Sequence, residues 1–270
     1  MPDHRLLLAS ALSALLLFTA CDFNLRRPSR AEASPKRAEA TRAIKAPRYD
    51  AERYEAALQA IEAQRQRLAR RYAEAKGERQ KRAIRAEARG VVTRAITETI
   101  FPAWMGTPWG LGRNSTATRP HQEGMVVGCS YFVTSVLQNA GLKLSNRYTF
   151  AQAPALHIQR SLAPARADLH RFLSIPPSQL EAKLRKLSDG LYVIGLVNHV
   201  GFVVIRGDEV RIVHSSFTGE RDVADEALAE APAVAASQEA GYFVTPLFQD
   251  DRLIAFWLEG RAVPFQKLGM

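Results

Sequence analysis

At Val127-Gly128-Cys129-Ser130-Tyr131-Phe132-Val133, a loop that contains glycine turns into a helix. Apolar residues then recur at spacings of three and four as far as Ala140, and Gly141 stands where such a helix would end. Cys129 therefore lies at a predicted helix start, where the helix dipole favours a thiolate over a thiol. We expect a lowered thiol pKa, about 7 or below if a histidine joins it. Cys129 is accordingly a candidate nucleophile.

Length and charge limit the kind of protein that the chain can be. Its 270 residues are 47% apolar, enough for a sizeable core, and composition shifts along the chain predict one domain with extensions. The formal charge of +10 favours an anionic partner or surface: nucleic acid, phospholipid head groups or an acidic cell-wall polymer. Charge alone does not choose among these.

Residues 1–21 have the pattern of a secretion signal: basic residues, a short apolar run, and small residues before Cys21. This end resembles the lipobox of bacterial lipoproteins, which implies that Cys21 is acylated after cleavage. An ordinary cleaved signal or an uncleaved anchor is the alternative. With Cys21 lipidated, Cys129 has no disulfide partner within the chain. We expect a lipid-anchored protein of the cell envelope that faces the periplasm or the exterior.

Residues 22–48 are predicted to be a disordered basic tether, since they are rich in Lys, Arg and Pro and almost free of large apolar residues. Residues 49–89 form a predicted helical extension, with one apolar stripe up to Tyr72 that restarts out of phase after Gly77. The first helix is expected to pack on its neighbour or on a protein partner. Residues 49–100 are therefore a possible contact surface for such a partner. Its arginines lack the aromatic interleaving of a nucleic-acid surface, so no nucleic acid is expected as a partner.

Residues 90–265 are predicted to form an α+β domain, with helices first and antiparallel strands after them. The expected strands are residues 191–197, 200–205, 210–213, 242–248 and 253–258, and residues 178–187 and part of 222–237 are expected to be helical. The polar loop at residues 113–124, which precedes the Cys129 helix, is the kind of segment that builds sites.

His199 and His214 stand out among the six histidines because they lie on the two arms of a predicted hairpin. If Gly207-Asp208 is its two-residue turn, the histidines share one face as diagonal neighbours, about 7 to 8 Å apart at their Cβ atoms, and an Arg206-Gly207 turn would place them directly opposite, about 5 Å apart. A three-residue loop without a bulge would put them on opposite faces. A histidine that accepts a proton from a thiol works best when a third group holds its other ring nitrogen. The spacing therefore suits a Cys, His, His relay.

Four segments together resemble the NlpC family of cell-wall cysteine peptidases. They are residues 106–112 (Gly-Thr-Pro-Trp-Gly-Leu-Gly), Cys129-Ser130 at a helix start, His199-Val200-Gly201-Phe202, and Val213-His214-Ser215. The resemblance implies a papain-like fold in which Cys129 attacks an amide carbonyl, His199 acts as base and then acid, and His214 orients His199. It also implies peptide stems of peptidoglycan as the substrate, without a cofactor.

The chain departs from the family around the predicted cleft, which we expect Trp109, Ser130 and His121 to line. Trp109 stands where the family usually has a tyrosine, and Gly128 and Tyr131 replace the Asp and Gly that usually flank the Cys-Ser pair. The separation between Cys129 and His199 is also longer than expected. These departures leave room for another amidase or acyl-transfer reaction.

Other interpretations remain open. A cysteine on an apolar helix is often a small core residue, and a non-catalytic envelope protein could use the fold as a binding or scaffold module. A Cys, His, His zinc site lacks a nearby second cysteine or a placed carboxylate, so no metal is expected. His157 and His170 carry no pattern and are expected at the surface.

Overall fold

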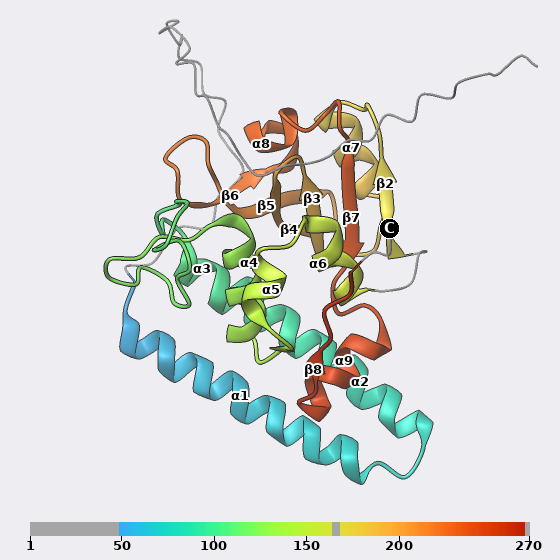
Figure 1. Cartoon of the computed structure of the whole chain (residues 1–270). Coiled ribbons are helices and arrows are strands. Elements are labelled where there is room, and N and C mark those ends of the chain that lie inside the picture. Colours follow the sequence, from blue (N-terminus) through green and yellow to red (C-terminus); the bar gives the residue numbers. More distant parts are fainter. Residues whose placement is uncertain (1–48, 164–167, 268–270) are drawn as a thin grey trace, which may run out of the picture. The chain divides into compact units, whose positions relative to one another are not determined.

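An antiparallel sheet forms the centre of the fold. The computed structural model describes residues 49–163 and 168–267, and within them six strands pair in the order β2-β7-β3-β4-β5-β6 (Figure 1). Their bounds are β2 (His170–Phe172), β3 (Gly190–Leu196), β4 (His199–Arg206), β5 (Glu209–Ser215), β6 (Val223–Ala227) and β7 (Tyr242–Pro246). A separate parallel pair joins β1 (Lys143–Leu144) to β8 (Ala262–Val263). The predicted α+β class with an antiparallel sheet is confirmed.

Helices surround this sheet. Two long ones open the described chain, α1 (Ala51–Glu74) and α2 (Glu78–Arg94), and α2 continues through a π-helical segment, η1 (Ala95–Ile100), into α3 (Phe101–Trp104). The helix that begins at Cys129 is α4 (Cys129–Asn139), as its spacing predicts. The others are α5 (Arg147–Ala151), α6 (Ala155–Leu162), α7 (Pro177–Leu184), the 3₁₀ turn η3 (Leu228–Glu230), α8 (Pro232–Ala235) and α9 (Asp251–Glu259).

Apolar cores cover both faces of the sheet. Helix α4 packs on β4, where the rings of Phe101 and Phe132 lie 5.2 and 5.9 Å from the ring of Phe202. On the opposite face, Leu180 and Leu184 of α7 belong to a second buried cluster with the alternate strand residues. Alternation along each strand therefore divides the sheet between two cores.

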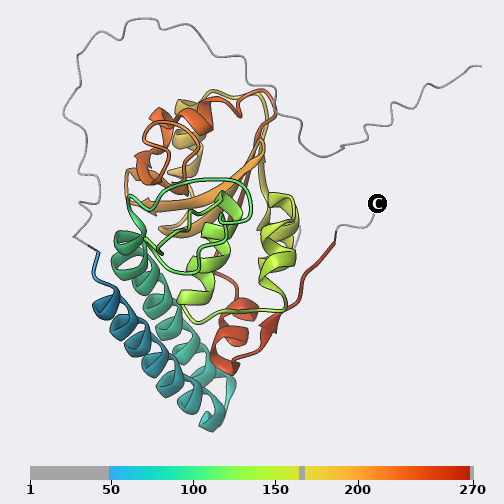
Figure 2. The same ribbon diagram turned by 60° about the vertical axis from the view of Figure 1, so that its left-hand side comes forward.

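Helices α1 and α2 lie side by side, as Figure 2 shows. The predicted break at Gly77 is present, and α2 runs across the expected domain boundary at residues 89 and 90. The apolar stripe of α1 is buried, and Tyr54 Oη donates to Asn139 Oδ1 of α4 over 2.6 Å. Arg65 Nη1 donates to the Trp257 carbonyl of α9 over 3.0 Å. The face that was expected to meet a neighbour or a partner is thus covered by the chain itself.

Two sequence predictions are wrong. Residues 253–258 form helix α9 instead of a strand, because the Asp250 side chain caps its first turn by accepting the Leu253 N–H over 2.9 Å. Gly260, with φ of +64°, ends it. The first part of residues 222–237, expected to be a helix or loop, is strand β6 because it pairs with β5; η3 and α8 follow.

The predicted signal at residues 1–21 with Cys21, and the predicted tether at residues 22–48, lie outside the described residues. Among the residues that are described, no helix is long and apolar enough to cross a membrane.

Candidate active site

Cys129 is held in place by a network of backbone hydrogen bonds around the start of α4. The Gly128 N–H donates to the Ser115 carbonyl, and the Val127 N–H donates to the Pro108 carbonyl, each over 2.9 Å. Ser215 Oγ, at the end of β5, donates to the Val127 carbonyl over 2.7 Å. The residues before Cys129 are thus tied both to the loop at residues 106–116 and to the sheet.

The Cys129 thiol lies against the first residues of β4, where its sulfur accepts a hydrogen bond from the Val200 backbone N–H. The side chain is partly exposed, and protein packs around the remainder of it. Burial raises the pKa of the thiol, and the N–H groups of Val200, Ser130 and Cys129 oppose this increase only in part. The expected lowering of the thiol pKa is therefore wrong, because burial outweighs the helix start.

The predicted hairpin has the predicted register. Gly207 and Asp208 form the turn, and Arg206 pairs with Glu209. A Cβ placed on Gly201 would lie 2.8 Å from the Cβ of His214, so these two residues face each other as the count along the strands requires. His199 is the diagonal neighbour of His214, and their ring centroids are 4.9 Å apart.

The two histidines form a hydrogen-bonded chain that ends on a carboxylate. His199 Nε2 lies 2.6 Å from His214 Nδ1, and His214 Nε2 lies 2.6 Å from Glu226 Oε2 of β6. A carboxylate accepts, so His214 donates from Nε2, and its Nδ1 accepts from His199 Nε2–H. This assignment leaves Nδ1 of His199 as an unprotonated ring nitrogen. The Glu226–His214–His199 chain therefore fixes His199 in the tautomer that a base needs.

His199 is neutral in this environment. Burial, and secondarily the neighbouring His214, lowers the pKa of His199 from 6.5 to about 3. Among the described residues, no hydrogen bond joins Cys129 Sγ to the His199 ring. The resting site thus holds a neutral thiol and a neutral imidazole. Helix α4 packs on the sheet face of Val200 and Phe202, whereas His199 shares the alternate face with Val203.

Aromatic side chains build the wall beside His199. The Phe217 ring contacts the His199 ring edge-on, with centroids 5.3 Å apart, and lies 6.4 Å from the Trp109 ring. The guanidinium of Arg221 lies over Trp109, 4.5 Å from the ring centroid. Trp109 in turn bridges to Val127, two residues before the candidate nucleophile. The Phe217 and Trp109 rings therefore form one aromatic surface beside His199.

The structure brings Ser130 to the site but not His121. The Ser130 hydroxyl donates its one proton to the Ala151 carbonyl, which ties α4 to α5. His121 Nε2 lies 3.1 Å from the Met105 carbonyl, and its ring centroid lies 5.1 Å from that of Tyr49 in a tilted contact. Within the described chain, no hydrogen bond or ring contact links His121 to Cys129 or His199.

Two functional candidates, Glu226 and Phe217, were not found from the sequence. Glu226 lies in the segment predicted to be a short helix and loop, so its diagonal relation to His214 could not be derived. Recognising strand β6 would have supplied the signal, because His214 pairs with Ala224 and Glu226 is the next residue on the same face.

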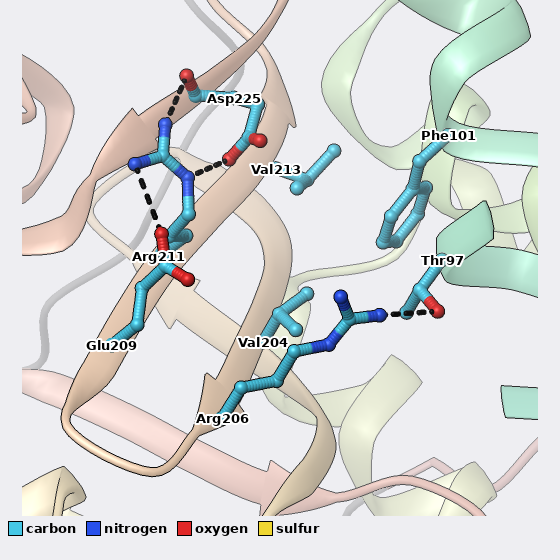
Figure 3. Close-up of a pocket in the computed structure, with 8 residues that line it drawn as sticks. All are labelled: Thr97, Phe101, Val204, Arg206, Glu209, Arg211, Val213 and Asp225. Atoms are coloured by element: carbon cyan, nitrogen blue, oxygen red, sulfur yellow. Dashed lines mark hydrogen bonds and ion pairs between the residues drawn. The ribbon is translucent and has the colours of Figure 1, made fainter. Parts of the chain in front are cut away.

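A pocket of about 120 Å³ lies elsewhere, between η1 and strands β4, β5 and β6 (Figure 3). Its two arginines are hydrogen-bonded within the lining: Arg211 Nε donates to Asp225 Oδ1 over 2.7 Å, and Arg206 donates to Thr97 Oγ1 over 3.0 Å. None of the predicted site residues lines it. Within the described residues, no group of three or more His, Cys, Asp or Glu is placed to hold a metal ion.

Comparison with known proteins adds no assignment: no family model, no curated protein and no solved structure matches the chain.

Proposed function

We propose that the chain is a cysteine hydrolase of the bacterial cell envelope that cleaves amide bonds, with peptidoglycan stem peptides as substrate. The observation that carries this proposal is the Glu226–His214–His199 chain, which leaves an unprotonated ring nitrogen on His199, the residue before Val200, whose backbone N–H contacts Cys129. A cysteine at a helix start, packed on an antiparallel sheet, supports the resemblance to the papain-like NlpC peptidases.

The proposed reaction starts from the neutral pair. As Cys129 Sγ bonds to the amide carbonyl carbon, its proton passes to His199 Nδ1, so charge develops only during attack. The His199 imidazolium then gives this proton to the leaving amine as the C–N bond breaks. Water, deprotonated by His199, hydrolyses the thioester, which releases the carboxylate product and restores the thiol. His214 and Glu226 position His199 and stabilise its positive charge.

The start of α4 provides the stabilisation of the tetrahedral intermediate in this proposal. Backbone N–H groups in the first turn of a helix have no partner within the helix, and that of Cys129 lies at the reacting sulfur. The Trp109 and Phe217 rings form the wall against which the substrate packs. The proposal requires Sγ and His199 Nδ1 to come into contact when substrate is bound.

Digestion of purified peptidoglycan tests this function. The full chain is incubated with sacculi and with soluble stem peptides, and products are identified by mass spectrometry, with Cys129→Ala as the matched control. We expect new amine and carboxylate termini that are absent with the variant. Cross-linked or transferred products would indicate acyl transfer instead. Intact substrate after digestion, under conditions where a known peptidase cleaves it, would contradict the proposal.

A binding module that keeps this fold is the second candidate function. It is favoured by the raised pKa of Cys129 and by the lack of a hydrogen bond between Sγ and the His199 ring among the described contacts. Such a module would bind peptidoglycan equally well with Cys129→Ala and would form no covalent adduct with an ester probe. Sedimentation with sacculi, measured for both chains, separates binding from cleavage.

The envelope location is proposed from the sequence pattern around Cys21. Growth with an alkyne-bearing fatty acid is expected to label the wild-type chain and to leave Cys21→Ala unlabelled. Labelling that persists in the variant would contradict acylation at this residue.

A further inference from the structure

A second pocket, here named the α2–η1 pocket, lies between α2, η1, the start of β3 and the end of β4. It has a volume of about 400 Å³, within the range of small-molecule sites. It adjoins the smaller pocket of Figure 3, because both are lined by Thr97, Val204 and Arg206. None of the candidate active-site residues lines it, and Arg206 and His199 stand at opposite ends of β4. The pocket is therefore separate from the candidate active site.

Four charged side chains line this pocket without pairing with one another. They are two cations and two anions: Arg94, Arg206, Glu98 and Asp189. Among the described contacts, none of the four forms an ion pair, whereas Arg89, which also lines the pocket, lies 3.3 Å from Asp251. Opposite charges that share a pocket but stay apart are complementary to a ligand that carries both signs.

Contacts within the protein hold two of these charged groups in place. Arg206 Nη2 donates to Oγ1 of the buried Thr97 over 3.0 Å. Figure 3 shows the Arg206 side chain extending from β4 toward η1 to reach this hydroxyl. Of the two anions, Asp189 accepts the Gly207 N–H at Oδ1 over 3.0 Å. Side chains that are already fixed lose less conformational entropy when a ligand binds.

The space beside Gly90 is taken by the guanidinium of Arg94. Gly90 lies inside α2, where glycine is less favourable for a helix than alanine. A Cβ added to Gly90 would lie only 3.2 Å from Arg94 Nη1, so the guanidinium lies back over the helix at this point. Arg94 also directly precedes the π-helical segment η1, and such segments are frequent at functional sites. Local structure thus places a second cation in the lining of the pocket.

We infer that the α2–η1 pocket binds a zwitterion, namely an amino acid or short peptide with a free ammonium and a free carboxylate. The ligand carboxylate pairs with the guanidinium groups of Arg94 and Arg206, whose planar donors match its geometry. The ligand ammonium donates to the carboxylates of Glu98 and Asp189. Hydrolysis of a peptide produces both groups, but the inference rests on the pocket and not on the proposed function.

Calorimetric titration of the full chain with matched ligands tests this inference. Alanine and dialanine carry the two charges at different separations. For each, the N-acetyl form lacks the ammonium and the amide form lacks the carboxylate. We expect at least one zwitterion to bind, and loss of either charge to weaken its binding at least about tenfold. The absence of binding by both zwitterions up to about 10 mM, or equal affinity for a form that lacks one charge, would contradict the inference.

Two charge-neutral variants assign the ends of the ligand. Arg206→Gln should weaken binding of the zwitterion about tenfold and leave the affinity for the amide form unchanged, because that form has no carboxylate. Glu98→Gln should weaken the zwitterion similarly and leave the affinity for the N-acetyl form unchanged. Arg70→Gln and Glu74→Gln, at exposed positions of α1, are the matched controls for net charge. Equal weakening of every ligand by a variant, or the same effect in the controls, would overturn the assignment.

Filling the pocket tests where the ligand binds. Gly90→Leu places a side chain where the Arg94 guanidinium lies, and leucine favours a helix, so the chain should fold while the affinity falls at least about tenfold. Cys129→Ala should bind the zwitterion as the wild type does, which separates this site from the proposed hydrolase. Unchanged affinity in the folded Gly90→Leu chain, or loss of binding in Cys129→Ala, would place the ligand elsewhere and reject the inference.

Discussion

Strands β5 and β6 carry two diagonal pairs of side chains. One is the Arg211–Asp225 pair, and the other is the His214–Glu226 pair, which continues to His199. On one face Arg211 donates to Asp225, and on the other His214 donates to Glu226, over 2.7 and 2.6 Å. Arg211 also lies 3.7 Å from Glu209, so two carboxylates balance its charge (Figure 3). His214 instead passes the interaction on to His199, whose Nδ1 remains unprotonated. The same strand geometry thus serves the stability of the sheet on one face and a chemical role on the other.

Breaking the Arg211–Asp225 pair should cause the largest loss in the free energy of unfolding. Asp225→Asn leaves Arg211 without its nearest counter-charge, and a loss of about 3 kcal/mol in the free energy of unfolding is expected. Because this pair lies on the face away from His214, p-nitrophenyl acetate should still acylate Cys129 at nearly the wild-type rate. Urea unfolding measures the first quantity. A loss below about 0.5 kcal/mol would show that the pair is not structural.

The Glu226–His214–His199 series of hydrogen bonds should affect how the free energy of unfolding depends on pH. His199 has a pKa of about 3 when folded and 6.5 when unfolded, so in this interval only the unfolded chain takes up its proton. The contribution is fully present above pH 6.5 and is lost as pH falls, by about 1.4 kcal/mol per pH unit. Between pH 6.5 and 5, wild type should therefore lose about 1.6 kcal/mol more than His199→Gln, since the unfolded histidine is already half protonated at pH 6.5. Identical pH slopes would mean that His199 is not buried as described.

Weakening the interaction of Glu226 with His214 should have the smallest effect of the three changes. Glu226→Gln keeps an acceptor for His214 but removes the negative charge, and we expect acylation of Cys129 to slow about tenfold. Glu209→Gln removes the same charge beside the Arg211–Asp225 pair and serves as the control. Equal rates for wild type and Glu226→Gln would remove Glu226 from the site.

The hairpin that carries the histidines could be predicted because its information is local. A two-residue turn at Gly207-Asp208 determines the register, and the register places His199 and His214 on one face. The start of α4 at Cys129 was predictable for the same reason, since apolar spacing and Gly141 mark its limits.

What could not be predicted depends on distant contacts. Strand β6 is rich in alanine and acidic residues, and it becomes a strand through pairing with β5, which brings Glu226 to His214. The raised pKa of Cys129 follows from tertiary burial, which no local pattern reports. Helix α9, in contrast, could have been predicted. Asp250 and Gly260 are helix-cap residues in the sequence, but the apolar run at residues 253–258 was interpreted as a strand.

Acylation of Cys129 by p-nitrophenyl acetate tests the central claim, that His199 is the base for this thiol. One equivalent of p-nitrophenolate should be released per chain at about pH 7, as the ester C–O bond breaks and the thiol proton passes to His199. His199→Ala should slow this burst at least about 100-fold, and imidazole in solution should restore part of the rate. Equal bursts in the two folded chains, or a slow variant that imidazole leaves unchanged, would contradict the account.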